Sequence, residues 1–198
     1  HHSDSWEAIY AHTPGLKVVT PSTPSDAKGL LLAAIEDPDP VVFLEPIRLY
    51  RSVKEDVDDD AFTVPIGSAA VRRTGSDVTL ISWGAMTKET RAAAEALAPK
   101  GIDAEVIDVR SLVPLDTDTI LGSVERTGRA VVIHEAPRNA GFGAELSALI
   151  AERCLYSLRA PVRRVTGWDT VFPLKRGEGL YLPSVERIVA AAMSTMEG

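Results

Sequence analysis

Strand-like and helix-like segments alternate from residue 67 to the C-terminus, and this order limits the fold more than any other feature. The strand-like runs lie at 78–83, 104–109, 130–133 and 162–165, and the helical patterns lie at 87–97, 116–126, 143–155 and 184–193. Consecutive parallel strands need a crossover of a dozen or more residues, usually a helix, so the alternation favours a parallel sheet. Val131–Ile133 is apolar throughout, which is typical of a strand covered on both faces. We therefore predict an α/β domain over 67–198, with a mostly parallel sheet flanked by helices.

The first 50 residues form a smaller unit. Their pattern predicts strands at 18–19 and 41–44, a helix at 6–11, and a second helix that begins near Thr23 and runs to about Ile35. This is too little to bury a core alone, so we expect the segment to dock on a missing N-terminal part or on a partner. Residues 51–66, with the acidic run 54–60, are interpreted as an interdomain linker, and a solvated loop within one domain is the alternative.

Charge and composition exclude several classes of function. There are 21 Lys and Arg against 28 Asp and Glu, which gives a net charge of −7, and no basic run exceeds two residues. Such a chain is a poor candidate for binding nucleic acid or an anionic membrane. No window approaches 18 apolar residues, so we predict no membrane span.

The cysteine content and the first residues bear on where the protein works. Cys154 is the only cysteine, so an internal disulfide and a CxxC motif are excluded. It is interpreted as a small buried hydrophobe, with a reactive thiol as the alternative. The sequence starts at His1 without Met and has no secretory signal, so we expect a start inside a longer product or after a tag, in a reducing, cytoplasmic setting.

Two short segments could carry chemistry. His2 precedes a predicted helix, whose dipole favours a neutral imidazole that can accept a proton near pH 7, although paired terminal histidines are also what a purification tag leaves behind. Asp37 and Asp39 follow the end of the second helix. Carboxylates beside helix-end carbonyls form a hard-oxygen cation site, and a rigid turn is the alternative.

Two loops at the ends of predicted strands are further candidates. The stretch 134–145 follows a strand and opens a helix with Gly141 and Gly143, which would allow close approach to a ligand or a neighbouring chain. A helix-packing loop is the alternative to a ligand loop. The aromatic loop 167–173 is either a subunit contact or a pair of buried anchors. No nucleophile elbow, P-loop or HxxxH pattern occurs in the sequence.

A series of short motifs runs through nearly the whole chain in a fixed order. They are His1–Ser5, Pro14–Val19, Asp26–Leu31, Phe43–Pro46, Leu49–Arg51, Asp77–Leu80, Glu105–Arg110, Thr127–Arg129, His134–Pro137 and Ala160–Val162. Together they resemble the beta subunit of thiamine-diphosphate-dependent 2-oxoacid dehydrogenases. The double histidine and Phe43–Pro46 look most like the branched-chain member, 2-oxoisovalerate dehydrogenase, and the pyruvate and acetoin members share most of the pattern.

The resemblance implies a domain organisation and a parent reaction. Residues 1–50 resemble the end of a pyrimidine-binding α/β domain, and 67–198 resemble a transketolase C-terminal-type domain. The parent enzyme would be an oxidoreductase that decarboxylates branched-chain 2-oxoacids and transfers the acyl unit to lipoyl groups. Its thiamine diphosphate and Mg²⁺ would be held mostly by residues outside this chain, so we expect the chain alone to be inactive.

Site residues and partners also follow from the resemblance. His2 matches the family histidine that is associated with the 2-oxoacid carboxylate or with reductive acylation of the lipoyl group, which favours a catalytic role over a tag. Ala34, Asp37 and Asp39 match a potassium-type site, with Asp39 in place of an amide residue. The implied partners are the alpha subunit, a second beta subunit and the lipoyl acyltransferase core. The alternatives are a pyruvate or acetoin dehydrogenase beta subunit and a non-catalytic subunit-association module.

Overall fold

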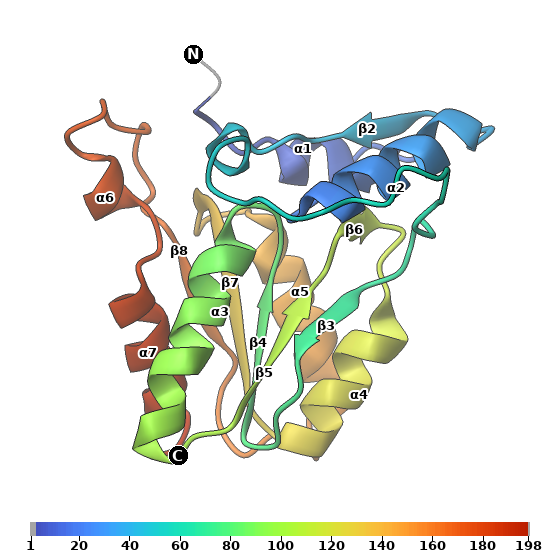
Figure 1. Cartoon of the computed structure of the whole chain (residues 1–198). Helices are drawn as coiled ribbons and strands as arrows, with labels where there is room; N and C mark the ends of the chain where they lie inside the picture. Colours follow the sequence, from blue (N-terminus) through green and yellow to red (C-terminus); the bar gives the residue numbers. More distant parts are fainter. Residues whose placement is uncertain (1–2, 198) are drawn as a thin grey trace.

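The computed structural model describes residues 3–197, and Figure 1 shows its two parts, a small N-terminal part above a larger α/β part. The helices are α1 (Glu7–Ala11), α2 (Pro24–Glu36), α3 (Met86–Leu97), α4 (Thr117–Thr127), α5 (Phe142–Cys154), α6 (Glu178–Tyr181) and α7 (Val185–Ser194), with 3-10 turns η1 (Ile47–Leu49) and η2 (Ala98–Lys100). The strands are β1 (Lys17–Val19), β2 (Val41–Phe43), β3 (Ala70–Arg73), β4 (Val78–Ser82), β5 (Ala104–Asp108), β6 (Ser111–Val113), β7 (Ala130–Pro137) and β8 (Arg163–Gly167).

The larger part is a five-stranded sheet in the order β3-β5-β4-β7-β8. All neighbours are parallel except β3, which pairs antiparallel with β5 at the edge. Helices α3 and α7 pack on one face and α4 and α5 on the other, so that each face has its own apolar core (Figure 1). Because both faces are covered, β4 and β5 are buried along their whole length. The predicted α/β fold with a mostly parallel sheet is confirmed.

The N-terminal part contains a second sheet that the larger part completes. Strand β1 pairs parallel with β2 and antiparallel with β6, which follows β5 in the chain. The first 50 residues dock on β6 of the same chain, a contact that was not predicted from the sequence, and their docking on a further N-terminal part or a partner stays a prediction. A strand of three residues, Ser111–Val113, has no periodicity that distinguishes it from a loop, which is why the sequence did not indicate it.

Buried charges join the two parts. Asp26, on α2, accepts hydrogen bonds from Arg72 of β3 and from Arg110, whose Nη1 lies 2.9 Å from Asp26 Oδ1. Arg72 Nη2 also lies 2.9 Å from Asp108 Oδ2, and Ser22 donates to the same carboxylate. Asp26 and Asp108 are both buried. Two carboxylates and two guanidinium groups therefore balance one another at this interface, where each charge alone would be unfavourable.

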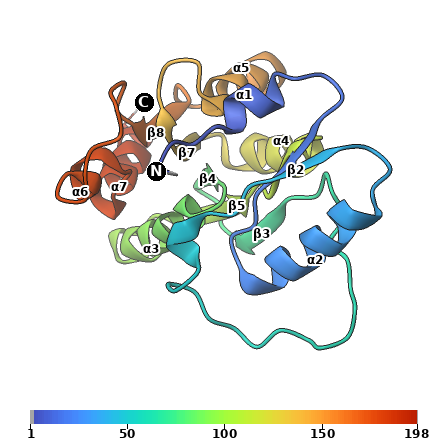
Figure 2. The same cartoon turned by 90° about the horizontal axis from the view of Figure 1, so that it is seen from above.

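The predicted linker also packs on the N-terminal part. Residues 51–66 contain no helix or strand, but the Val64 N–H donates to the Gly29 carbonyl at 3.0 Å. Phe62 and Val64 lie so close to Gly29 that a Cβ there would overlap both side chains. Lys28 donates to carbonyl groups of the acidic run. The segment therefore connects the parts and covers α2 as well (Figure 2).

Replacing Asp26 by Asn tests the buried charge network. The amide leaves two guanidinium groups without their shared negative charge, and breaking a buried pair in this way costs about 3 kcal/mol or more. Denaturant unfolding should show that loss for Asp26→Asn. The exposed Asp59 forms no side-chain contact of this kind among the described residues, and Asp59→Asn should unfold like the parent. An equal stability for both variants would contradict the role given to the network.

Candidate functional site

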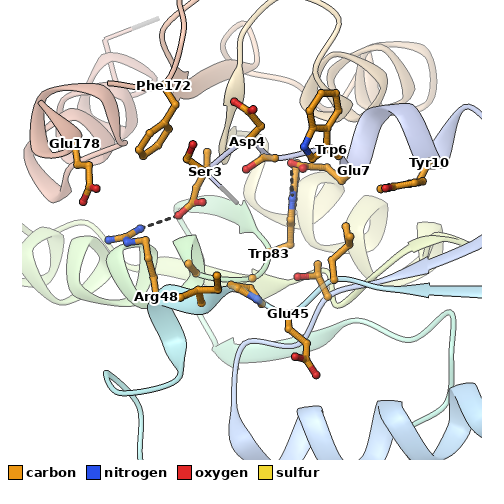
Figure 3. Close-up of a pocket in the computed structure, with 18 residues that line it drawn as sticks. Ser3, Asp4, Trp6, Glu7, Tyr10, Glu45, Arg48, Trp83, Phe172 and Glu178 are labelled. Carbon is orange, nitrogen blue, oxygen red and sulfur yellow. Dashed lines mark hydrogen bonds and ion pairs between the residues drawn. The ribbon is translucent and has the colours of Figure 1, made fainter. Parts of the chain in front are cut away.

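A cleft with a volume of about 550 Å³ lies between the two parts. Figure 3 shows the side chains that line it. Its walls come from residues 3–7 and 44–48 of the N-terminal part and from the segments that follow β4 and β8, together with the end of β7. In open α/β sheets, ligands bind outside the carboxyl ends of the strands, and this cleft lies at that edge. Its volume is in the range of small-molecule and cofactor sites.

The turn that follows β4 lines the cleft, and Gly84 in this turn is closely packed. Gly84 follows β4 with φ +55°, in the left-handed region that favours glycine. A Cβ at this position would lie 3.0 Å from Thr20 Oγ1 and 3.1 Å from Pro46 Cγ. The N-terminal part therefore approaches the end of β4 so closely that a Cβ at Gly84 would be crowded, and it places residues 44–48 beside Trp83.

The cleft is acidic. Five carboxyl side chains and one guanidinium group line it: Asp4, Glu7, Glu45, Glu135, Glu178 and Arg48. The guanidinium is already shared, because Arg48 Nη1 lies 2.7 Å from Glu135 Oε1 and Nη2 lies 2.9 Å from Glu89 Oε1. Burial raises the pKa of Glu135, and the hydrogen bond from Arg48 acts against that rise. The walls therefore offer carboxyl groups and no unshared cation among the described residues.

Glu7 and Trp83 are hydrogen-bonded at the inner wall. Figure 3 shows the hydrogen bond that Trp83 Nε1 donates to Glu7 Oε1. The two atoms lie 3.2 Å apart, and both residues are 5% exposed. Burial raises the pKa of Glu7 above its usual value, against its hydrogen bonds to its own backbone and to Trp83. The indole is packed in turn against His134 and Phe142.

His134 lies behind Trp83 in the core. Its ring stacks on the indole with centroids 5.2 Å apart and an interplanar angle of 12°. The imidazole is fully buried, and neither ring nitrogen has a hydrogen-bond partner among the described residues. Burial, with the charges of Arg164 and Arg138, lowers its pKa to about 4. His134 is therefore neutral at physiological pH.

The two glycines of the 134–145 stretch make room for this ring. A Cβ on Gly141 would lie 2.8 Å from His134 Cε1, and one on Gly143 would lie 2.5 Å from His134 Nε2. The imidazole thus occupies the space beside the start of α5. Close packing at the start of α5 therefore accounts for the two glycines, whereas Glu135 of the same stretch lines the cleft.

The other predicted candidates lie inside and outside the cleft. His2 is outside the described residues, and Ser3, which follows it, lines the cleft. In the aromatic loop, Phe172 lines the cleft and packs on Tyr181, whereas Val171 is 87% exposed. Cys154 is buried, and burial raises the pKa of its thiol, as the interpretation as a small hydrophobe requires.

The predicted cation residues lie away from the cleft. Asp37 and Asp39 both face Lys17, whose Nζ lies 2.7 Å from Asp37 Oδ1 and 3.1 Å from Asp39 Oδ2. The Ala34 carbonyl belongs to the last turn of α2, and Pro38, four residues on, has no N–H to donate to it. Residues 3–197 contain no cluster of three or more side chains suited to a metal ion. An inorganic cation would have to share the carboxylates of Asp37 and Asp39 with the ammonium group of Lys17, so this set of oxygen donors does not fit a cation as it stands. The potassium site stays a prediction.

Sequence reasoning missed the main residues of the cleft. Glu7 looks like an ordinary acidic residue in a first helical turn, and Trp83 like the last residue of a strand. Arg48 and Glu135 lie 87 positions apart, so no local pattern links them. The one usable signal was the position of Trp83 and Glu135 at the ends of predicted strands, where α/β sites form.

Two family descriptions match this chain. The family described as "Transketolase, C-terminal domain" matches residues 67–188, and "Transketolase, pyrimidine binding domain" matches 1–53. Proteins described as "Pyruvate dehydrogenase E1 component subunit beta" are 50% identical in Staphylococcus epidermidis and 49% identical in Bacillus subtilis, over 99% of this chain and 60% of theirs. The chain thus spans about three fifths of the length of these relatives.

A solved structure has the same fold. The protein described as "Split gene transketolase, inactive beta4 tetramer" superimposes with a TM-score of 0.80 at 26% sequence identity, over 99% of this chain and 62% of its own. Within residues 3–197, no helix has both the length and the apolar character needed to cross a membrane.

The buried imidazole predicts a specific pH dependence of stability. In the unfolded chain His134 titrates near 6.5 and in the folded chain near 4, so the unfolded state binds the additional proton between these values. The stabilisation is complete above pH 6.5 and falls by about 3 kcal/mol as the pH drops to 4. Urea unfolding of the parent and of His134→Phe over this range measures it as the difference between their pH profiles. Parallel profiles would contradict the assignment of a neutral, buried imidazole.

Proposed function

This chain belongs to the family defined by the transketolase C-terminal domain, and from that we propose that it is part of the beta subunit of a pyruvate dehydrogenase E1 component. The observation that carries the proposal is the 48–50% identity to proteins of that description along 99% of the chain. The match runs through both parts and through the segment that contains His2. A single shared domain would support only the fold.

The proposed substrate is pyruvate, in place of the branched-chain 2-oxoacids that the sequence analysis put first. The relatives described above are named for pyruvate, which supports the alternative stated there. The double histidine and Phe43–Pro46 pointed to the branched-chain member, and the identity of about 50% to relatives named for pyruvate along 99% of the chain outweighs two short motifs. The proposed reaction is oxidative decarboxylation, with transfer of the acetyl unit to a lipoyl group.

The cleft supplies part of the site for this reaction. Thiamine diphosphate, when bound, supplies the electron sink for the carbanion that decarboxylation leaves. On this chain, Trp83 and Phe172 offer apolar walls that fit an aromatic ring, and the buried inner wall excludes water. The acidic lining and the shared Arg48 do not fit a diphosphate, whose charge calls for unshared cations. The groups that hold the diphosphate and Mg²⁺ must therefore come from outside the described residues.

The proposed partners follow from this division of the site. An alpha subunit would supply the cationic and metal-binding groups that the cleft lacks, and a second beta subunit and the lipoyl acyltransferase core complete the assembly. The net charge of −7 suits a basic docking domain on the core.

A second candidate, a non-catalytic association module, is favoured by one observation. The solved structure of similar fold is described as an inactive tetramer of beta chains. If this candidate held, the full-length subunit would form oligomers and would not restore turnover when mixed with an alpha subunit.

Substrate preference tests the proposed function. The full-length subunit, assembled with its alpha subunit and thiamine diphosphate, should turn over pyruvate with a kcat/KM at least about 10-fold above that for 2-oxoisovalerate, since one or two methylene groups in a pocket account for that much discrimination. Decarboxylation assays with both acids measure the ratio. The reverse preference would restore the branched-chain reading, and no turnover of either acid would favour the association module.

His2 is the proposed acid or carboxylate-binding residue of the site. A histidine can protonate a leaving thiolate or hydrogen-bond a carboxylate, and losing such a group lowers turnover about 10²-fold. In the assembled enzyme, His2→Ala should therefore reduce acyl transfer to lipoyl groups, or 2-oxoacid use, by that factor. His12→Ala, at the end of α1 and outside the cleft lining, is the matched control. Near-parental turnover of His2→Ala would remove His2 from the mechanism.

A further inference from the structure

The inner wall of the cleft contains the carboxyl group of Glu7, which is buried although it belongs to the first turn of a helix. Glu7 is the first residue of α1, where acidic side chains normally face solvent and interact with the helix dipole. Here the side chain is 5% exposed and still lines the cleft. Helix α1 has only five residues, so its dipole gives little compensation for removing the carboxyl group from water.

The larger part of the chain holds this carboxyl group in place. Trp83 Nε1 donates to Glu7 Oε1, and Trp83 is itself fixed between His134, stacked at 5.2 Å, and Phe142, edge-on at 5.8 Å. An indole packed on two rings cannot rotate without opening the core beneath it. The hydrogen bond therefore sets the position of the Glu7 carboxyl group from the β4 side.

Burial favours the protonated form of Glu7, and the charges around it act in the same direction. Glu135 acts on it as a like charge, and the cation nearest to Glu135, Arg48, is shared with Glu89. His134, behind Trp83, is neutral above its pKa of about 4. The elements packed against α1 are β1, β6 and α5. Lys17 of β1 is paired with Asp37 and Asp39, and β6 contains no charged residue. In α5, the acidic residue of the first turn, Glu145, is exposed to solvent. Among residues 3–197, the ion pairs do not include Glu7.

We propose that Glu7 is a proton-holding group of the cleft and that Trp83 is the residue that positions it. The inference rests on the proposed function and adds to it a second acid besides His2. It also gives the transketolase C-terminal-type part a direct role in the site, because the positioning residue belongs to that part.

The proposed step moves one proton from Glu7 to a basic atom in the cleft. The O–H bond of the Glu7 carboxyl group breaks as a bond forms between that proton and a basic atom in the cleft, either a thiolate sulfur of the dihydrolipoyl product or a neutral imidazole nitrogen. The carboxylate that remains keeps the N–H of Trp83 as its donor, which stabilises the charge while it lasts. The proton returns when solvent re-enters the cleft, and no oxidant or reductant is consumed.

Trp83 fluorescence tests the proposal without any activity measurement. The chain has three tryptophans, and Trp6→Phe with Trp168→Phe leaves Trp83 as the only indole. Its emission should then change in two steps with pH: one near 4, from the stacked His134, and one above 4.5, the ordinary value for a glutamic acid, from Glu7. Glu7→Gln, which keeps the shape of the side chain, should remove the upper step and keep the lower one.

The fluorescence test has a control variant and two results that would contradict the proposal. Glu152→Gln, an exposed change on α5, should leave both steps in place. The absence of any step above pH 4.5 in the chain that retains Glu7 would overturn the proposal, even if Glu7→Gln failed to fold. An upper step that persists in a folded Glu7→Gln chain would overturn it as well.

Activity then tests the role in the reaction. In the assembled full-length enzyme, Glu7→Gln should lower kcat for acyl transfer about 10²-fold, with KM for the 2-oxoacid little changed and one limb of the pH–rate profile displaced. Glu152→Gln should keep the parental kcat. Parental kcat and pH profile in Glu7→Gln would refute the proton-holding role, whereas an inactive parent enzyme would refute the proposed function and leave the fluorescence result to decide on Glu7.

Discussion

The balance of charge between Asp26 and the two arginines that it binds holds the two parts of this chain together. Arg72 and Arg110 come from the β3 edge and from the segment between β5 and β6, and Asp26 comes from α2. These charges are removed from water, so they stabilise the fold only when all of them are paired. The pairing fixes α2 against the larger sheet, and with it the position of residues 44–48 at the cleft.

The cleft depends on this docking because neither part forms it alone. The N-terminal part contributes Glu7 and Arg48, and the larger part contributes Trp83, Glu135 and the loop after β8. The Arg48–Glu135 pair and the Trp83–Glu7 hydrogen bond each cross from one part to the other. The transketolase C-terminal-type part therefore contributes Trp83, whose indole N–H is bonded to the buried Glu7 carboxyl group at the cleft wall.

Sequence reasoning succeeded where a segment has a strong period or an unbroken apolar run. Strand β7 and helices α3 and α5 follow from such patterns, and their order predicts the parallel sheet. It failed for β3 and β6, which are short strands at sheet edges that take their partners from distant parts of the chain. It also missed Glu7, because burial of that carboxyl group depends on Trp83, 76 positions further on. Such contacts are properties of the folded chain and leave no local signal.

The most direct test of the account is a crystal structure of the full-length subunit assembled with its alpha subunit, thiamine diphosphate and a 2-oxoacid analogue. The account predicts that the cofactor ring and the analogue lie against the cleft, between Trp83 and the segment of residues 3–7. The diphosphate would be held by groups from outside this chain. A cofactor bound elsewhere, with the cleft filled by protein side chains, would contradict the assignment of the site.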